Sequence, residues 1–464
     1  MQQALAGLFQ QIRASNYDVL SIDLKKNGSL ISSLQNELQR FDNRELDKLV
    51  ESQNFHNGKW TRFNIMILSF LKFSRDVDPW STWENVDIIF NFYSDLNNCL
   101  LNDSYPIDKL IEVFLSITEF IIPFATTLDE NYVLLGTRQY QFLSHTSSII
   151  SKLFNSIKPH SEANTNGNVL QGKQAILLYL VNKLNNIYFK IDSPQLCSNI
   201  FKNFKPKSSI ENFSEYPLTQ RIEYRYLLGK YYLTNARITN SFVQLNSAFD
   251  LLCSAYNLLG YNVHPSIKKN ALKILRYLIP AGLIMGKLPN FKLIEALDLQ
   301  LASSYIKLAH YIREGNIKGL NLWLQHNERD LSHRYLLIIF LEKLPMIAYR
   351  YLVRKTIMEW SISQNLNRLP FDVLERMMKL SIGDDSDRPD LNKISIYNGI
   401  HNYKNVENVL VTLINLGYLR GNCYPLLKVC VFQKTQNIND VLPPIDERIL
   451  AMFPLNSEDA WLDN

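Results

Sequence analysis

The stretch NVENVLVTLINLGYLRG, Asn405 to Gly421, and the run LLKVCVFQK, Leu426 to Lys434, decide the fold of the carboxy-terminal part of this chain. In the first stretch, apolar residues recur at helical spacing until Gly417 marks a stop. In the second, side chains alternate between two faces, as in a half-buried strand. A helix, a glycine and a strand in this order predict a small winged helix. One more helical repeat followed by an isolated strand is the alternative.

The sequence also predicts a further helix and an insertion next to these two stretches. A further helix is predicted from Pro370 to Leu380, and the acidic, turn-rich residues 382–400 predict an exposed insertion after it. The strand from Leu426 to Gln433 has two possible partners. If its edge is open it can pair across a subunit boundary, and otherwise its own chain covers it.

Farther upstream, the chain is rich in helical periodicity. Between Lys173 and Lys190, one stripe comprises Ile176, Leu177, Leu180, Val181, Leu184, Ile187 and Tyr188. The same spacing marks YLLGKYYL (Tyr226 to Leu233), LRYLIPAGLIMGKLP (Leu275 to Pro289) and HYIREGNIKGLNLWL (His310 to Leu324). Short polar or Pro/Gly-bearing breaks favour antiparallel helix pairs. We therefore expect an all-α solenoid of degenerate tetratricopeptide-like repeats, followed by a carboxy-terminal winged helix with a small β-wing.

Composition breaks divide the chain into four expected parts. Small polar residues, Pro and Gly displace the apolar stripe between Lys158 and Gly172, where we expect a flexible loop or a domain boundary. The expected parts are an amino-terminal helical region (1–160), a helical-repeat solenoid (173–348), a winged-helix domain (349–440) and a tail (441–464). We expect the tail to dock through Ile445, Leu450, Met452 and Phe453.

The composition is that of a folded protein with a mild basic bias. Of its 464 residues, 46% are hydrophobic and 20% charged, and the formal net charge is +5. This bias is compatible with a nucleic-acid or acidic-protein partner. The five cysteines are odd in number and far apart. A disulfide framework or zinc site is therefore not expected, and a reducing compartment is the natural interpretation.

Targeting signals are weak. The amino-terminal MQQALAGLFQQIRAS lacks the regions of a signal peptide, and we see no apolar stretch near the roughly 18 residues that a membrane span needs. We therefore expect a soluble, intracellular protein with no membrane partner. The basic runs are too short to separate nucleus from cytosol.

Catalytic patterns give no candidate. The segment GLIMGK, Gly282 to Lys287, has one residue too few between its glycines for a phosphate loop, and Leu288 stands where Ser or Thr would bind magnesium. His310, His326 and His333 match no common metal-ligand spacing. We expect neither catalysis nor a metal or cofactor.

Several segments resemble the PCI family, whose members occur in the proteasome lid, the signalosome and translation initiation complexes. The resemblance rests on the order of repeats and winged helix and on YLLGKYYL, LIPAGLIMGKLP, and IREGNIKGLNLWL followed by YRYLVRKTIMEW (Tyr349 to Trp360). One subgroup, the PCI subunit of the transcription and export complex two, is similar over further segments, namely Phe70 to Tyr93, Gln141 to Pro159, Leu177 to Ser208 and Ile396 to Arg420. A signalosome-associated relative shares the central segments.

The resemblance implies PCI architecture and a noncatalytic adaptor, located in the nucleus at the nuclear pore, in a complex that couples transcription to mRNA export. Such subunits pair through their winged helices with a larger PCI-like scaffold subunit. They also hold a small acidic, largely disordered subunit shared with the proteasome lid. The two winged helices jointly present a surface for RNA or DNA. A PCI adaptor that binds only proteins is the alternative.

Two sets of basic residues are candidate binding sites. Long cationic side chains on one surface suit phosphate contacts, and the nucleic-acid candidates are Arg350, Arg354, Lys355, Lys404, Arg420, Lys428 and Lys434. The predicted recognition helix offers Glu407, Asn408, Thr412 and Asn415 and no cation, so we expect nonspecific backbone binding or protein packing there. The candidates for the acidic subunit are Lys202, Lys205, Lys207, Arg221, Arg225, Lys230 and Arg237. Ordinary solvated faces are the alternative for both sets.

Overall fold

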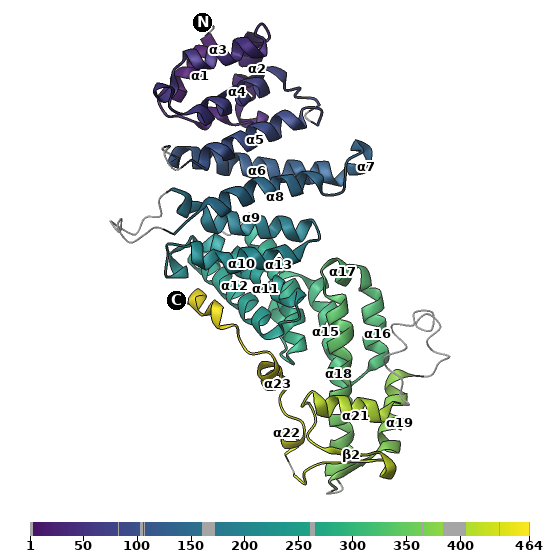
Figure 1. Cartoon of the computed structure of the whole chain (residues 1–464). Helices are drawn as coiled ribbons and strands as arrows, with labels where there is room; N and C mark the ends of the chain where they lie inside the picture. Colours follow the sequence, from purple (N-terminus) through teal and green to yellow (C-terminus); the bar gives the residue numbers. More distant parts are fainter. Residues whose placement is uncertain are drawn as a thin grey trace. The chain divides into compact units, whose positions relative to one another are not determined.

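A computed structural model of the chain describes residues 3–81, 83–102, 105, 107–159, 172–259, 265–363, 366–383, 405–435 and 437–463. The chain is mostly helical and forms two compact units, unit 1 (Met1–Tyr216) and unit 2 (Pro217–Asn464) (Figure 1). The boundary between the units falls inside the range 173–348, which the sequence predicts as one solenoid. The finer division into four parts stays a prediction.

Unit 1 is a series of helices in which neighbours along the chain pack on one another, as Figure 1 shows for α4, α5, α6 and α8. The helices are α1 (Gln3–Arg13), α2 (Leu24–Leu38), α3 (Asn43–Ser52), α4 (Thr61–Asp76), α5 (Val86–Leu100), α6 (Asp108–Glu130), α7 (Tyr132–Leu135), α8 (Gln141–Ser156), α9 (Leu177–Lys190) and α10 (Cys197–Lys207). The apolar stripe predicted between Lys173 and Lys190 is buried throughout, which confirms it. The burial of this stripe fixes α9 between α8 and α10.

Helix α6 corrects one sequence expectation. Among the described residues, α6 is long and apolar enough to cross a membrane, with a mean hydropathy of 1.6 over 18 residues. The prediction that no apolar stretch approaches that length is therefore wrong. In unit 1, α6 packs against α5 and α8 and buries Leu110, Phe114, Ile117 and Ile121. These contacts explain its apolar composition as that of a core helix.

Unit 2 contains a longer set of helices and a small sheet. The helices are α11 (Leu218–Thr234), α12 (Ile238–Leu259), α13 (Pro265–Ile284), α14 (Phe291–Leu297), α15 (Leu299–Glu314), α16 (Ile317–His326), α17 (Glu328–His333), α18 (Leu337–Thr356), α19 (Phe371–Ile382), α21 (Val406–Asn415), α22 (Ile438–Val441) and α23 (Ile445–Met452). Helix α18 packs against α13, α15, α16, α19 and α21, so it lies at the centre of the unit.

Glycine permits the close approach of α11 and α12. A Cβ atom on Gly229 would lie 2.6 Å from the Leu245 side chain, and Ser241 Oγ donates to the Gly229 carbonyl at 2.8 Å. A larger residue at position 229 would force the two helices apart. The glycine within YLLGKYYL therefore has a packing role.

Three short strands form an antiparallel sheet in unit 2. They are β1 (Arg368–Pro370), β2 (Asn422–Tyr424) and β3 (Val429–Val431), in the order β1-β3-β2. Because β3 is the central strand, its own chain covers both of its edges. The strand is shorter than the predicted run, since Pro425–Leu427 forms a single 3₁₀ turn and Lys428 adopts a left-handed φ of 50°. The two helices that the sequence predicts upstream of this strand correspond to α19 and α21.

The tail is docked along unit 2. Ile445 is buried and contacts the turn at Gly286, where φ is +74° and a Cβ atom would lie 3.1 Å from the Ile445 side chain. The predicted docking role is confirmed for Ile445. It is wrong for Leu450 and Met452, which are exposed, whereas Trp461 and Leu462, which the sequence analysis did not single out, are buried. Phe453 is half-buried.

Candidate functional site

Exposed cations gather at one end of the three-stranded sheet. Arg368 lies opposite Val431, and Val431 lies opposite Asn422. Arg420 and Lys434 lie only a few residues beyond Asn422 and Val431, so the strand directions bring them to the same end as Arg368. All three cations are exposed. We call Arg368, Arg420 and Lys434 the basic end of the sheet.

Two of these residues were candidates from the sequence and one was missed. Arg368 escaped notice because β1 is only three residues long and includes a proline, which is unusual inside a sheet. The signal that could have found it is the pairing of a short extended segment, RLP, with the predicted strand. Lys428 is also exposed, but it lies at the turn between β2 and β3, at the opposite end of the hairpin.

Arg354 and Lys355 occupy the last turn of α18. Arg354 is half-buried and Lys355 is exposed, with its Nζ donating to the Glu314 carbonyl at 3.4 Å. Cations in the last turn of a helix interact favourably with its negative end, which gives both residues a structural reason to be there. They stay candidates for phosphate contacts because their side chains reach the surface.

Arg350 has a different position. It is 6% exposed, and its guanidinium donates to the Leu442 and Pro443 carbonyls at 3.2 and 2.8 Å. Burial lowers the pKa of Arg350 from its ordinary value. A buried guanidinium whose Nη2 already donates to two backbone oxygens is not exposed to a phosphate. We therefore leave Arg350 out of the proposed interface and assign it to packing between α18 and the start of the tail.

Lys404 and residues 384–400 of the predicted acidic insertion lie outside the described residues. The predicted recognition helix corresponds to α21, whose sequence contains Glu407 but no lysine or arginine. Its exposed Thr412 donates to the Asn408 carbonyl of its own helix at 2.7 Å. This helix therefore supplies no cation for a phosphate contact.

The second basic set is divided between the units. In unit 1, Lys202 and Lys205 are exposed on α10, whereas Lys207 is half-buried. The Lys207 Nζ donates to the Asn155 and Ile157 carbonyls at 3.1 and 2.9 Å, and burial lowers its pKa. In unit 2, Arg237 is exposed, and Arg221 and Lys230 are half-buried.

Arg225, the remaining member of the set, is buried beneath the chain's own tail. Its guanidinium donates to the Leu462 carbonyl, to Asp463 Oδ1 at 2.8 Å and to Gln244 Oε1 at 2.9 Å. Next to it on α11, the Tyr232 hydroxyl donates to Asp459 Oδ2 at 2.6 Å. The tail segment Ser457–Asp463 is thus an acidic segment already docked on α11. An acidic partner contacting Arg225 would first have to displace it.

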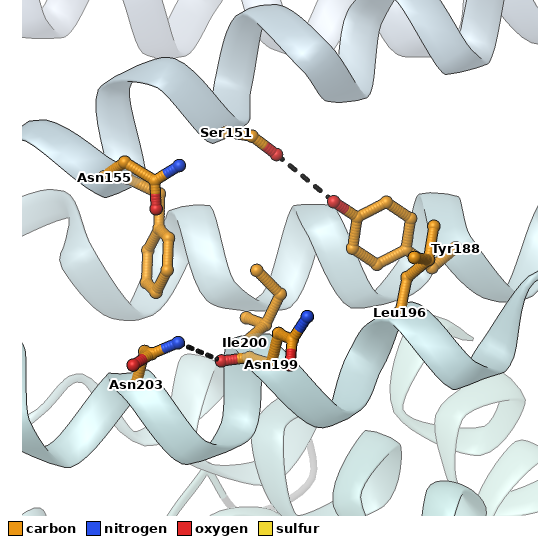
Figure 2. A pocket seen from close by; sticks show the side chains of 8 residues that line it. Ser151, Asn155, Tyr188, Leu196, Asn199, Ile200 and Asn203 are labelled. Atoms are coloured by element: carbon orange, nitrogen blue, oxygen red, sulfur yellow. Dashed lines mark hydrogen bonds between the residues drawn. The ribbon is translucent and has the colours of Figure 1, made fainter.

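A cleft opens on unit 1 between α8, α9 and α10 (Figure 2). Its volume is about 290 Å³. Among the described residues that line it there are no carboxylates, histidines, cysteines, lysines or arginines. The lining offers amide, hydroxyl and apolar groups, which suit recognition of an uncharged ligand.

Comparison with models of known protein families gives no match. Comparison with individual proteins gives several. The chain is 51% identical over 456 residues to the nuclear mRNA export protein THP1 of Saccharomyces cerevisiae, covering 98% of this chain and 99% of that protein. It is 28% identical over 280 residues to the PCI domain-containing protein 2 homolog of Dictyostelium discoideum, covering 60% and 56%. It is 27% identical over 244 residues to the CSN12 homolog of Schizosaccharomyces pombe, covering 52% and 50%.

Proposed function

Because the chain belongs to the PCI-domain family that includes the nuclear mRNA export protein THP1, we propose that it is a noncatalytic subunit of a nuclear complex that couples transcription to mRNA export at the nuclear pore. The observation that carries this proposal is the 51% identity over 98% of the chain. A match of that extent includes both compact units, whereas the PCI domain-containing protein 2 homolog and the CSN12 homolog named above align with 60% and 52% of the chain.

The carboxy-terminal part of unit 2 is proposed to be a winged helix. Helices α19 and α21 precede a hairpin of β2 and β3, and β1 completes the sheet on the other edge of β3. Two helices followed by a hairpin are the elements that such a domain requires. The hairpin then corresponds to the wing.

This winged helix is proposed to pair with a larger PCI-like scaffold subunit. Leu426 and Leu427, in the turn between β2 and β3, are 100% and 74% exposed. Adjacent apolar side chains with that exposure bury little surface within the fold and are typical of a contact surface. A small acidic, disordered subunit is proposed as the second partner. The exposed Lys202, Lys205 and Arg237 support it, and the tail on α11 restricts it to surfaces other than Arg225.

The nucleic-acid surface is proposed to include the basic end of the sheet, with Lys428, Arg354 and Lys355 as further members. Each lysine or arginine that neutralises a phosphate adds a salt-dependent increment of affinity that carries no sequence information. Because α21 presents no cation, binding is expected to be nonspecific.

Affinity purification of the tagged full-length chain tests the proposal. We expect mass spectrometry to find a larger PCI-like subunit and a small acidic subunit in stoichiometric amounts. Leu426→Asp with Leu427→Asp should lose the larger subunit while keeping the acidic one. Leu293→Asp is the matched control, because Leu293 is 67% exposed in unit 2 but lies on α14. Recovery of signalosome subunits alone would contradict the proposal.

A second candidate function is a signalosome-associated or other PCI adaptor that binds only proteins. The similarity to the CSN12 homolog favours it. Charge reversal of Arg420, Lys428 and Lys434 separates the two candidates. An adaptor without a nucleic-acid role would form a complex whose RNA binding these substitutions leave unchanged.

A further inference from the structure

The cleft on unit 1 has two polar walls. Ser151 and Asn155 lie on α8, and Asn199 and Asn203 lie on α10 across from them (Figure 2). The side chains of Asn155, Asn199 and Asn203 are exposed. Asn203 Nδ2 donates to the Asn199 carbonyl at 2.8 Å, which fixes the amide and leaves its oxygen as an acceptor for a ligand.

The floor of the cleft is apolar. Phe154 and Ile200 are 1% and 7% exposed, and the Tyr188 ring lies between the walls with its hydroxyl 3.2 Å from Ser151 Oγ. Leu196, 42% exposed, adds an apolar residue at the rim. An apolar floor between polar walls accommodates a ligand that has an apolar side chain on a polar backbone.

The spacing within each wall matches an extended peptide. Ser151 and Asn155 are four residues apart on one helix, as are Asn199 and Asn203 on the other. Four residues of an α-helix rise about 6 Å, and two residues of an extended chain rise about 6.6 Å. An extended chain directs the backbone groups of alternate residues to opposite sides. Each wall can therefore bind every second peptide group of the same segment.

The charge of the cleft selects among ligands. None of its described lining residues carries a formal charge, and the nearby Lys207 is engaged with the carbonyls of Asn155 and Ile157. The cleft lining thus offers no cation to a phosphate, and the amino group of Lys207 is held by backbone oxygens. A neutral peptide backbone needs donors and acceptors without charge, which asparagine amides supply.

We propose that this cleft binds a short, uncharged, extended segment of a partner protein. Asn155, Asn199 and Asn203 bind its backbone, and one apolar side chain contacts Phe154 and Ile200. The volume of about 290 Å³ lies near the lower end of the range of ligand pockets, about 300–1,000 Å³. The cleft therefore holds a few residues of the segment and not a folded domain. This inference is independent of the basic end of the sheet, because unit 1 alone supplies the cleft.

Selection from a displayed library of random dodecapeptides on the purified full-length chain tests the proposal. Selected peptides, synthesised with a fluorophore, are expected to bind the wild type and to share an uncharged core with one apolar residue. Asn199→Ala and Asn203→Ala together should weaken their binding by about tenfold or more, since each loses hydrogen bonds to the backbone. Asn91→Ala, at an exposed position on α5, is the matched control. Alanine favours helices more than asparagine does, so these variants are expected to fold.

Backbone N-methylation of the same peptides provides the second readout. Methylating a peptide N–H that faces α10 should weaken binding to the wild type by about tenfold. It should cause little further loss in the Asn199→Ala, Asn203→Ala variant, because the partner oxygen is already gone. The proposal is overturned if no peptide is selected, or if the selected peptides bind the variant as tightly as the wild type. It is equally overturned if oligouridine RNA binds the cleft in their place.

Discussion

The guanidinium of Arg350 donates hydrogen bonds to two carbonyls of the tail. The first prediction for a single residue follows from this contact. Arg350→Ala removes both hydrogen bonds and leaves buried oxygens without donors. Because a hydrogen bond from a charged group contributes about 1.5–3 kcal/mol, we expect the free energy of unfolding to fall by about 3 kcal/mol. Urea denaturation measures it. RNA binding by the folded variant, in complex, should be unchanged.

Lys355→Ala is the control for Arg350→Ala. Lys355 is exposed and its Nζ makes a long hydrogen bond, 3.4 Å, to the Glu314 carbonyl, so its loss should change stability by less than about 0.5 kcal/mol. An Arg350→Ala protein of normal stability that no longer binds RNA would contradict the packing role.

A second prediction for a single residue concerns the effect of Gly315 on stability. It ends α15 with φ +67°, and a Cβ atom there would lie 2.7 Å from Leu352 Cβ and 2.9 Å from the Leu352 backbone nitrogen. Gly315→Ala should therefore destabilise unit 2 by about 3 kcal/mol, because the α18 backbone cannot move aside. Gly28→Ala should instead stabilise α2 by about 0.5–1 kcal/mol, since nothing lies within 4 Å of the added carbon. Equal shifts in the midpoint of thermal denaturation for Gly315→Ala and Gly28→Ala would contradict this packing argument.

At the scale of elements, the tail segment Ser457–Asp463 has a pH-dependent contact with α11. Burial raises the pKa of Asp459 despite the hydrogen bond from Tyr232. The folded protein then binds a proton more tightly than the unfolded chain does. Docking is therefore weakened as the pH rises through the folded pKa, and strengthened as the pH falls toward the ordinary aspartate value of about 4.

Asp459→Asn should remove this pH dependence. Asparagine keeps an oxygen to accept from Tyr232 but carries no charge to desolvate, so we expect the tail of the variant to be docked at least as well at neutral pH. Hydrogen exchange of residues 456–463, corrected for the intrinsic rates and followed from the ordinary aspartate value of about 4 up to neutral pH, measures it. Glu458→Gln, an exposed neighbour, is the control. A wild-type tail with the same protection across this whole pH range would count against the argument.

Helices could be predicted from the sequence wherever apolar residues recur at helical spacing. The apolar stripe of α9 and the helices near positions 371–382 and 406–415 follow from spacing alone, because apolar residues recur on one face. The strand β1 could not be found, since three residues carry no period, and its pairing with β3 is a contact distant in sequence. The docking of the tail also depends on distant residues, namely Arg225 and Tyr232 of α11, which bind Asp463 and Asp459.

At the scale of the whole molecule, the two compact units predict two unfolding transitions. Each unit has its own buried core, and a part with its own core can in principle fold and unfold by itself. Gly315→Ala should lower the midpoint of one transition and leave the other within error. Pulse-labelling hydrogen exchange, which reports each helix, should place all of the destabilised helices between residues 217 and 463. A single transition that shifts as a whole would show that the units unfold together.

The family was predictable from the sequence, and the individual site residues were not. Full-length similarity to the nuclear mRNA export protein THP1 confirms the PCI resemblance, which rests on several segments along the chain and not on any single residue. By contrast, Arg350 and Arg354 are one helical turn apart on α18, yet one is buried and the other half-buried. Helix α18 is packed on most sides, so spacing does not reveal which cation reaches solvent.

The salt dependence of RNA binding tests the central claim most directly. It is measured with oligouridine on the complex assembled from the full-length chain, the larger PCI-like subunit and the acidic subunit. Because each phosphate contact on a single strand contributes about 0.7 to the slope of log K against log salt, Arg368→Ala, Arg420→Ala and Lys434→Ala together should reduce the slope by about 2. The exposed Lys25, Lys26 and Lys48 of unit 1, replaced by alanine, should leave it unchanged. An unchanged slope in the first triple variant would contradict the claim that the basic end of the sheet binds nucleic acid.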